Sequence, residues 1–197
     1  MCLRLDRLEI SGGFLLLTAW FGLVNGWRML GIVLGASLLH ETGHWLVLRL
    51  LGVRSGRLRI TALGAELDSD RQRLSYAEEL AAVLAGPAVN LLAGLLLAPL
   101  RGGWTTAAGA HLVLGAFNLL PVRPLDGGRA LELAVSWAAG PSAGDRTARW
   151  VGVAVSLAMA GGLTWLAWRS GSLWLLPAAA GSAKIAISEL APAKKVK

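Results

Sequence analysis

The stretch His40-Glu41-Thr42-Gly43-His44 combines two histidines and a carboxylate at a spacing suited to metal chemistry. Residues four apart lie on one face of a helix, so His40 and His44 can point their imidazoles at a single metal ion. Glu41 can reach a water activated by that metal without being a ligand itself. Imidazoles that hold Zn²⁺ and a carboxylate that acts as general base are the components of zinc-dependent peptide hydrolysis.

The surroundings of this motif are apolar. Within residues 29–51 the only other charged side chain is Arg49, so the motif lies in what reads as a membrane span. The same five residues also arise by chance in soluble helices. Ionisable groups inside a span are costly, however, and an unpaired Glu41 there would have to be neutral or well partnered. The setting therefore favours a metal site.

The composition is that of a membrane protein. The 197 residues are 55% hydrophobic and 16% charged, with a mean hydropathy of +0.58, whereas soluble domains carry about a quarter charged residues. We therefore expect one membrane-embedded domain over residues 1–197, with its catalytic core at about residues 29–135. The single cysteine, Cys2, excludes an intramolecular disulfide and a cysteine zinc site.

Six apolar segments predict an all-α polytopic fold with about six transmembrane helices. Most of them have about the length that a bilayer requires. The segments cover residues 10–25, 29–51, 77–100, 104–122, 150–168 and 172–190.

The placement of the basic residues predicts the orientation. With the N-terminus inside, most of the 19 Lys and Arg residues fall in inner segments, as the positive-inside rule requires. Both termini are then cytosolic. Topology and attraction to anionic lipid account for the net charge of +7, so nucleic-acid binding is not needed to explain it.

Between the second and third spans, residues 57–67 predict a small β-hairpin on the cytosolic side. Polar and apolar residues alternate up to Leu63, and Gly64 marks a turn. Two strands alone are marginal in water, so we expect them to rest on the membrane domain. The hairpin is either an exposed strand edge that pairs with an extended substrate or a plain connector.

Small residues recur every four positions in two of the predicted spans. Gly86, Asn90 and Gly94 form one face of the third span, and Gly31 and Gly35 form a G-x-x-x-G pattern in the second. Small residues allow helices to approach closely, and an asparagine at lipid depth requires a partner. Asn90 either serves helix packing or hydrogen-bonds near the metal.

The fourth span runs into a broken segment, Asn118-Leu119-Leu120-Pro121 through Pro124-Leu125-Asp126-Gly127-Gly128. Irregular backbone at membrane depth is tolerated where it is buried in protein or lines a wet cavity. Asp126 is either an ordinary Asp-Gly turn residue or the third metal ligand. The ligand interpretation balances charge, since Zn²⁺ with two neutral imidazoles, Asp126 and Glu41 sums to zero. His111 lies on the same helical face as Asn118 and is a buried hydrogen-bonded group, a residue behind the ligands or a group that polarises the substrate.

Taken together, these motifs resemble the site-2 protease family of intramembrane zinc metalloproteases. The resemblance rests on residues 40–44, 86–90 and 118–128 and covers about residues 31–133. Within the family, the chain looks like the bacterial branch typified by stage IV sporulation protein FB. We expect neither that branch's C-terminal CBS domain nor a PDZ-like insertion. Residues 62–65 depart from the branch's usual hairpin sequence, which leaves the substrate open.

The resemblance implies one Zn²⁺ per chain, with His40, His44 and Asp126 as ligands and Glu41 as general base. Asn90, together with Asn118 or His111, would donate hydrogen bonds to the substrate or the developing oxyanion. The implied location is the bacterial cytoplasmic membrane.

The implied reaction is cleavage of a membrane-associated or transmembrane protein near the cytosolic face. Substrates of this kind include a membrane-tethered pro-sigma factor, as in sporulation, and an anti-sigma factor, and a membrane regulatory protein is an expected partner. Two other functions remain open: an inactive protease-like scaffold or metal binder, and a zinc transporter. Retention of Glu41 argues against the scaffold, because zinc binding alone does not require it, and a transporter generally has several ligand clusters.

Overall fold

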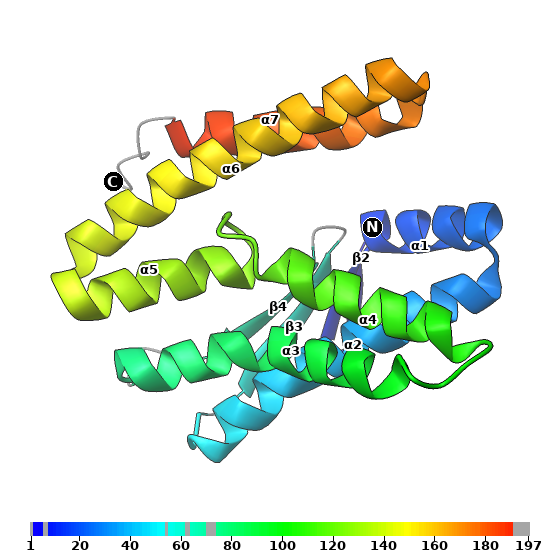
Figure 1. The fold of residues 1–197 in the computed structure, drawn as a ribbon. Coiled ribbons are helices and arrows are strands. Elements are labelled where there is room, and N and C mark those ends of the chain that lie inside the picture. The colour runs from blue at the N-terminus through cyan, green and yellow to red at the C-terminus, as the bar shows by residue number, and fades with distance from the viewer. Residues whose placement is uncertain (1, 6–7, 54, 62–63, 70–73, 191–197) are drawn as a thin grey trace. The chain divides into compact units, whose positions relative to one another are not determined.

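A computed structural model describes residues 2–5, 8–53, 55–61, 64–69 and 74–190 of the chain (Figure 1). It divides into two compact units, Met1–Phe117 and Asn118–Lys197.

The first unit contains four helices. They are α1 (Gly12–Asn25), α2 (Trp27–Leu50), α3 (Tyr76–Leu97) and α4 (Trp104–Asn118), of which α4 ends on the first residue of the second unit. Gly26, with φ of +86°, separates α1 from α2, a conformation that favours glycine. Helices α2 and α3 pack against each other.

A four-stranded sheet also belongs to this unit. Its strands are β1 (Cys2–Leu5), β2 (Leu8–Ser11), β3 (Ser55–Thr61) and β4 (Gly64–Ser69), in the spatial order β1-β2-β3-β4. Strand β2 runs parallel to β3, and the other two neighbouring pairs are antiparallel. Strand β4 therefore stands at one edge of the sheet.

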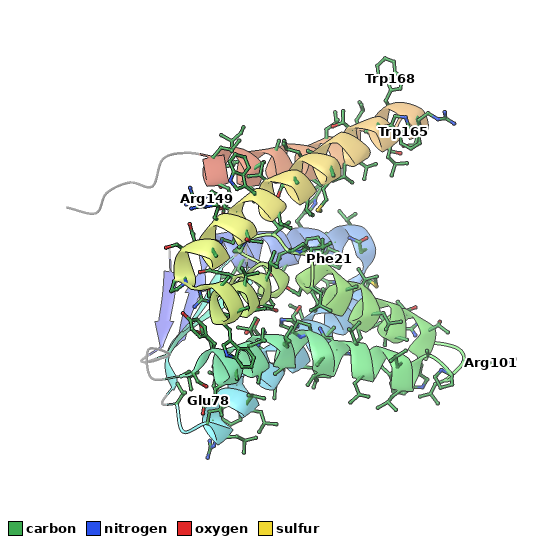
Figure 2. The ribbon with its side chains drawn as sticks, turned by 60° about the vertical axis from the view of Figure 1, so that its left-hand side comes forward. Phe21, Glu78, Arg101, Arg149, Trp165 and Trp168 are labelled. Carbon is green, nitrogen blue, oxygen red and sulfur yellow. The ribbon has the colours of Figure 1, made fainter. Side chains whose placement is uncertain are left out.

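Helix α3 begins with a well-formed cap. The Ser75 side chain accepts from Glu78 N, and the Glu78 carboxylate accepts from Ser75 N at 2.8 Å, which makes a reciprocal capping box. In Figure 2, Glu78 lies in the first turn of α3 and Arg101 in the loop that follows the helix. Beyond Glu79 the helix is apolar apart from Asn90, and Leu92, Leu95 and Leu96 are exposed on it.

The described residues of the second unit form helices joined by turns. It comprises α5 (Asp126–Ala139), α6 (Pro141–Ser170), the short 3-10 helix η2 (Leu173–Leu175) and α7 (Leu176–Leu190). Helix α6 packs against α5 and α7, and Figure 1 shows α6 and α7 running side by side. In Figure 2, Trp165 and Trp168 lie toward one end of α6 and Arg149 toward the other.

The predicted all-α fold with six spans is wrong in two respects. First, the chain contains a four-stranded sheet, because residues 2–5 and 8–11 form two strands that extend the β3–β4 pair. The prediction of a two-stranded hairpin that rests alone on the membrane domain was therefore wrong, because the sheet has four strands. Second, two of the described helices, α3 and α6, are long and apolar enough to cross a membrane. Helix α5 was not expected, since charges and small residues interrupt its apolar pattern.

Candidate metal centre

His40 and His44 lie one turn apart in the second half of α2. Their Nε2 atoms are 3.1 Å apart, and the two rings meet edge to face with centroids 4.7 Å apart. His40 is buried and His44 is partly buried. The pair thus presents two imidazole nitrogens to one point in space, as the i, i+4 spacing requires.

This separation fits a shared zinc ion. Zinc–nitrogen bonds of 2.0–2.1 Å at a tetrahedral angle place two ligand nitrogens roughly 3.3 Å apart. The observed 3.1 Å between the Nε2 atoms agrees with that value. The donor set therefore suits the group that the sequence implies.

Helix α3 holds the second histidine in a ligating orientation. His44 Nδ1 lies 2.8 Å from Ala82 O, and a carbonyl can only accept, so Nδ1 carries the proton and donates it to that carbonyl. The neutral ring then has its lone pair on Nε2, which faces His40. A backbone carbonyl behind a ligating histidine is a common means of setting its tautomer.

Two glycines allow the helices to approach closely enough for this contact. A Cβ atom at Gly43 would lie 2.8 Å from Ala85 O, and one at Gly86 would overlap the His44 ring at Nε2. Larger residues at either position would separate α2 from α3. Gly86 thus belongs to the site, although it contributes no functional group.

Asn90 lies between the first histidine and His111. It is 0% exposed, and its amide has Nδ2 3.4 Å from His40 Nδ1 and Oδ1 3.1 Å from His111 Nδ1. Both ends of the amide face an imidazole nitrogen, so the buried group is paired. The structure therefore brings Asn90 and His111 behind the first histidine.

Glu41 follows His40 on α2 and is partly buried. Its place in the helix leaves it one residue from one histidine and three from the other. This is the position that a general base occupies in the zinc-helix motif.

Asp126 is the first residue of α5 in the second unit and is partly buried. The preceding turn is held by Leu125 N donating to Val122 O at 2.8 Å, and Gly128 N donates to Leu125 O at 3.1 Å. Gly127 lies against the backbone of Leu119, where a Cβ would overlap the carbonyl oxygen. This turn is thus closely packed just where it delivers Asp126. Asn118, which closes α4, is also partly buried.

Arg123 has a role in this turn that no sequence pattern indicates. Its guanidinium lies 3.1 Å from Glu132 on α5, 3.0 Å from Asp145 on α6 and 3.6 Å from Glu189 on α7. Burial lowers the pKa of Arg123, but Asp145, Glu132 and Glu189 outweigh that effect and raise it, so the group stays charged. One side chain from the turn before Asp126 thus contacts all three helices of the unit. Carboxylates so far apart in sequence leave no local pattern that could have indicated this.

Comparisons with known proteins agree with the zinc site. Residues 100–160 match the model of peptidase family M50. The chain is 31% identical over 144 residues to the zinc metalloprotease MJ0392 of Methanocaldococcus jannaschii, covering 68% of this chain and 42% of that protein. It is 32% identical over 206 residues to a Mycobacterium tuberculosis protein named "Putative zinc metalloprotease Rip3", covering 90% of this chain and 50% of that one.

The fold is shared with a solved protease. The site-2 protease from Methanocaldococcus jannaschii matches with a TM-score of 0.68 over 100% of this chain and 98% of the solved chain, at 21% identity. The chain spans half or less of the length of the curated relatives it matches.

Residues 100–160 are thus similar to peptidase family M50, the longer alignments are to zinc metalloproteases, and the fold is that of a solved site-2 protease. Together with the donor set described above, the zinc metalloprotease relatives fit one Zn²⁺ per chain.

Proposed function

We propose that the chain is an intramembrane zinc metalloendopeptidase that cleaves membrane-associated or transmembrane proteins near the cytosolic face. The observation that carries this proposal is the histidine pair on α2. Its Nε2 atoms converge at the separation of zinc ligands, and one ring is held in the ligating tautomer by Ala82 O. Glu41 stands beside the pair in the position of a base.

Asp126 completes the ligand set in this proposal. Each of the three side chains offers a ligand atom that zinc accepts: an imidazole nitrogen from His40 and His44, and a carboxylate oxygen from Asp126. Three protein ligands leave the fourth tetrahedral position for reaction, which is the arrangement of catalytic zinc sites.

The zinc ion, when bound, lowers the pKa of a water to about 7 and polarises the scissile carbonyl. Glu41 accepts the proton of the attacking water and returns it to the leaving amine. Asn118 is the proposed hydrogen-bond donor to the substrate. Asn90 is better suited to a supporting role, because it is fully buried and both ends of its amide already face imidazoles.

Exposed apolar side chains on the helices support a membrane location. Trp20, Leu23 and Leu96 are each about two-thirds exposed or more, and α6 exposes Trp165 and Trp168. Exposed apolar surface on this scale marks contact with lipid or a partner. We propose a multi-pass protein of the bacterial cytoplasmic membrane with both termini in the cytosol, in line with the basic residues of the inner segments.

The substrate must present an extended segment, because a helical scissile carbonyl is already hydrogen-bonded within its helix. The edge strand β4 is the proposed surface for that segment, since an unpaired strand edge can add a strand. A membrane-tethered pro-sigma factor or an anti-sigma factor would suit such a site, with a membrane protein as regulator.

The test uses purified full-length chain in detergent and a fluorescent peptide library built on transmembrane segments. We expect zinc-dependent cleavage by the wild type and at least a thousand-fold slower cleavage by Glu41→Gln, on the order expected for loss of an essential base. Zinc content measured on the same samples should be equal. Glu78→Gln is the matched control, since glutamine preserves the capping box of α3. Cleavage by Glu41→Gln at the wild-type rate would refute the role of Glu41 as general base, whereas absence of cleavage by the zinc-loaded wild type would favour the inactive-scaffold alternative.

A further inference from the structure

The buried contacts behind His40 form one continuous chain of groups. It runs from His111 Nδ1 to the Asn90 amide at 3.1 Å, from that amide to His40 Nδ1 at 3.4 Å, and from His40 Nε2 to His44 Nε2 at 3.1 Å. It ends at Ala82 O, 2.8 Å from His44 Nδ1. Every link except the last joins groups whose donor and acceptor roles depend on one another, and in the last link the carbonyl can only accept.

Without a metal ion, Ala82 O sets the direction of the whole chain. The carbonyl requires a proton on His44 Nδ1, so with both rings neutral His44 Nε2 accepts and His40 Nε2 donates. His40 Nδ1 then accepts from Asn90 Nδ2, and Asn90 Oδ1 accepts from His111 Nδ1. His40 and His111 thus carry their protons on Nε2 and Nδ1 respectively.

Ligation of zinc through His40 Nε2 requires the opposite direction. That nitrogen must give up its proton to offer a lone pair, so the proton of a neutral His40 lies on Nδ1. Nδ1 can then only donate, and Asn90 must turn its oxygen toward it. The amide nitrogen consequently faces His111 Nδ1, which must accept, and the proton of His111 lies on Nε2.

We propose that Asn90 and His111 are positioning residues that set the tautomer of His40, and that His111 changes its ring tautomer when zinc binds. The proposal rests on the proposed zinc site but not on peptidase activity. The tautomer of His111 would then indicate whether zinc is bound, although His111 contacts the ligand His40 only through Asn90. Since Asn90 is 0% exposed, water cannot readily take the place of His111 as its second partner.

The chain's three histidines make the tautomers directly observable. The experiment records long-range ¹H–¹⁵N spectra of full-length protein labelled with ¹⁵N-histidine, in micelles, before and after addition of one equivalent of zinc. We expect His111 to shift from the Nδ1–H to the Nε2–H tautomer and His40 from Nε2–H to Nδ1–H, while His44 keeps its proton on Nδ1. The His111 signals are identified by their loss in His111→Phe.

Zinc affinity, measured by competition with a chelator, provides the second readout. Asn90→Leu should weaken zinc binding by about 10- to 100-fold, as loss of a group behind a ligand commonly does. His111→Phe should weaken it by about 10-fold, while His111→Gln, whose amide oxygen can accept from Asn90, should restore most of the loss. Asn25→Leu is the control, since that side chain bonds to Phe21 O within its own helix.

The outcomes separate this proposal from the proposed function. Zinc that binds His40 and His44 while His111 keeps one tautomer would overturn the relay and leave the peptidase proposal intact. A His111 tautomer that still responds to zinc in Asn90→Leu would also overturn it. Absence of zinc binding to the wild type would overturn both.

Discussion

Gly86 on α3 lies directly against the His44 imidazole on α2 and leaves no room for a side chain. The Cβ of any other residue at this position would overlap His44 Nε2, the atom that faces His40. The third apolar helix thus contributes to the metal centre by lacking a side chain at one position and by offering a carbonyl at another, Ala82 O.

Gly86→Ala should therefore weaken zinc binding by at least about 100-fold, because the methyl group displaces the His44 ring from its place between Ala82 O and His40. Chelator competition measures the change. Gly35→Ala is the matched control on α2, since a Cβ there meets no described residue within 4 Å. Equal zinc affinity in the two variants would contradict the close approach of α2 and α3.

Asp126→Asn and Glu41→Gln should affect the protein in different ways. A neutral amide is a poor zinc ligand, so Asp126→Asn should lose most of its bound zinc on dialysis and its cleavage with it. Glu41→Gln should keep the zinc and lose the cleavage, since it removes a base and no ligand. Metal analysis of the dialysed variants separates them, and a zinc-free Glu41→Gln would show that Glu41 is itself a ligand.

Gly127→Ala should lower zinc affinity without touching any ligand. Its Cβ would overlap Leu119 O, which is backbone and cannot move aside without shifting the turn that carries Asp126. We expect zinc affinity to fall by at least about tenfold, because a small displacement of the Asp126 carboxylate weakens its bond to the metal. Gly140 has a φ of +88°, so it makes a poor control, whereas Gly109→Ala in α4 has open space and should bind zinc normally.

Arg123→Gln should destabilise the second unit. The change removes the ion pairs that Arg123 makes with Glu132, Asp145 and Glu189. Glu132 still pairs with Arg129, and Asp145 still pairs with Arg149. Because the Arg123 side chain is 28% exposed, we expect a loss of about 1–2 kcal/mol, less than for a fully buried pair. Arg149→Gln removes an exposed i, i+4 pair and should cost about 0.3–0.5 kcal/mol. Thermal unfolding of the two variants compares them, and equal melting temperatures would contradict a central role for Arg123.

Several features could be predicted from local sequence because they depend on neighbours in the chain. Helices at about residues 29–51, 77–100 and 104–122 follow from apolar runs, and their bounds lie within a few residues of α2, α3 and the start of α4. Other features could not be predicted in this way. Strands β1 and β2 are four residues each, and β2 pairs with residues of β3 that lie fifty positions later, so nothing in the neighbouring sequence indicates a sheet.

The sequence by itself determined that His40 and His44 share a helical face beside Glu41, because 3.6 residues per turn place i and i+4 together in any α-helix. It also determined the zinc chemistry that this set favours. Only the tertiary structure decided what stands behind the ligands. Ala82 O, Gly86 and Asn90 reach the histidines from another helix, with Asn90 fifty residues from His40 and His111 a further 21 along the chain. Such contacts arise from the packing of helices that are distant in sequence, and no local pattern records them.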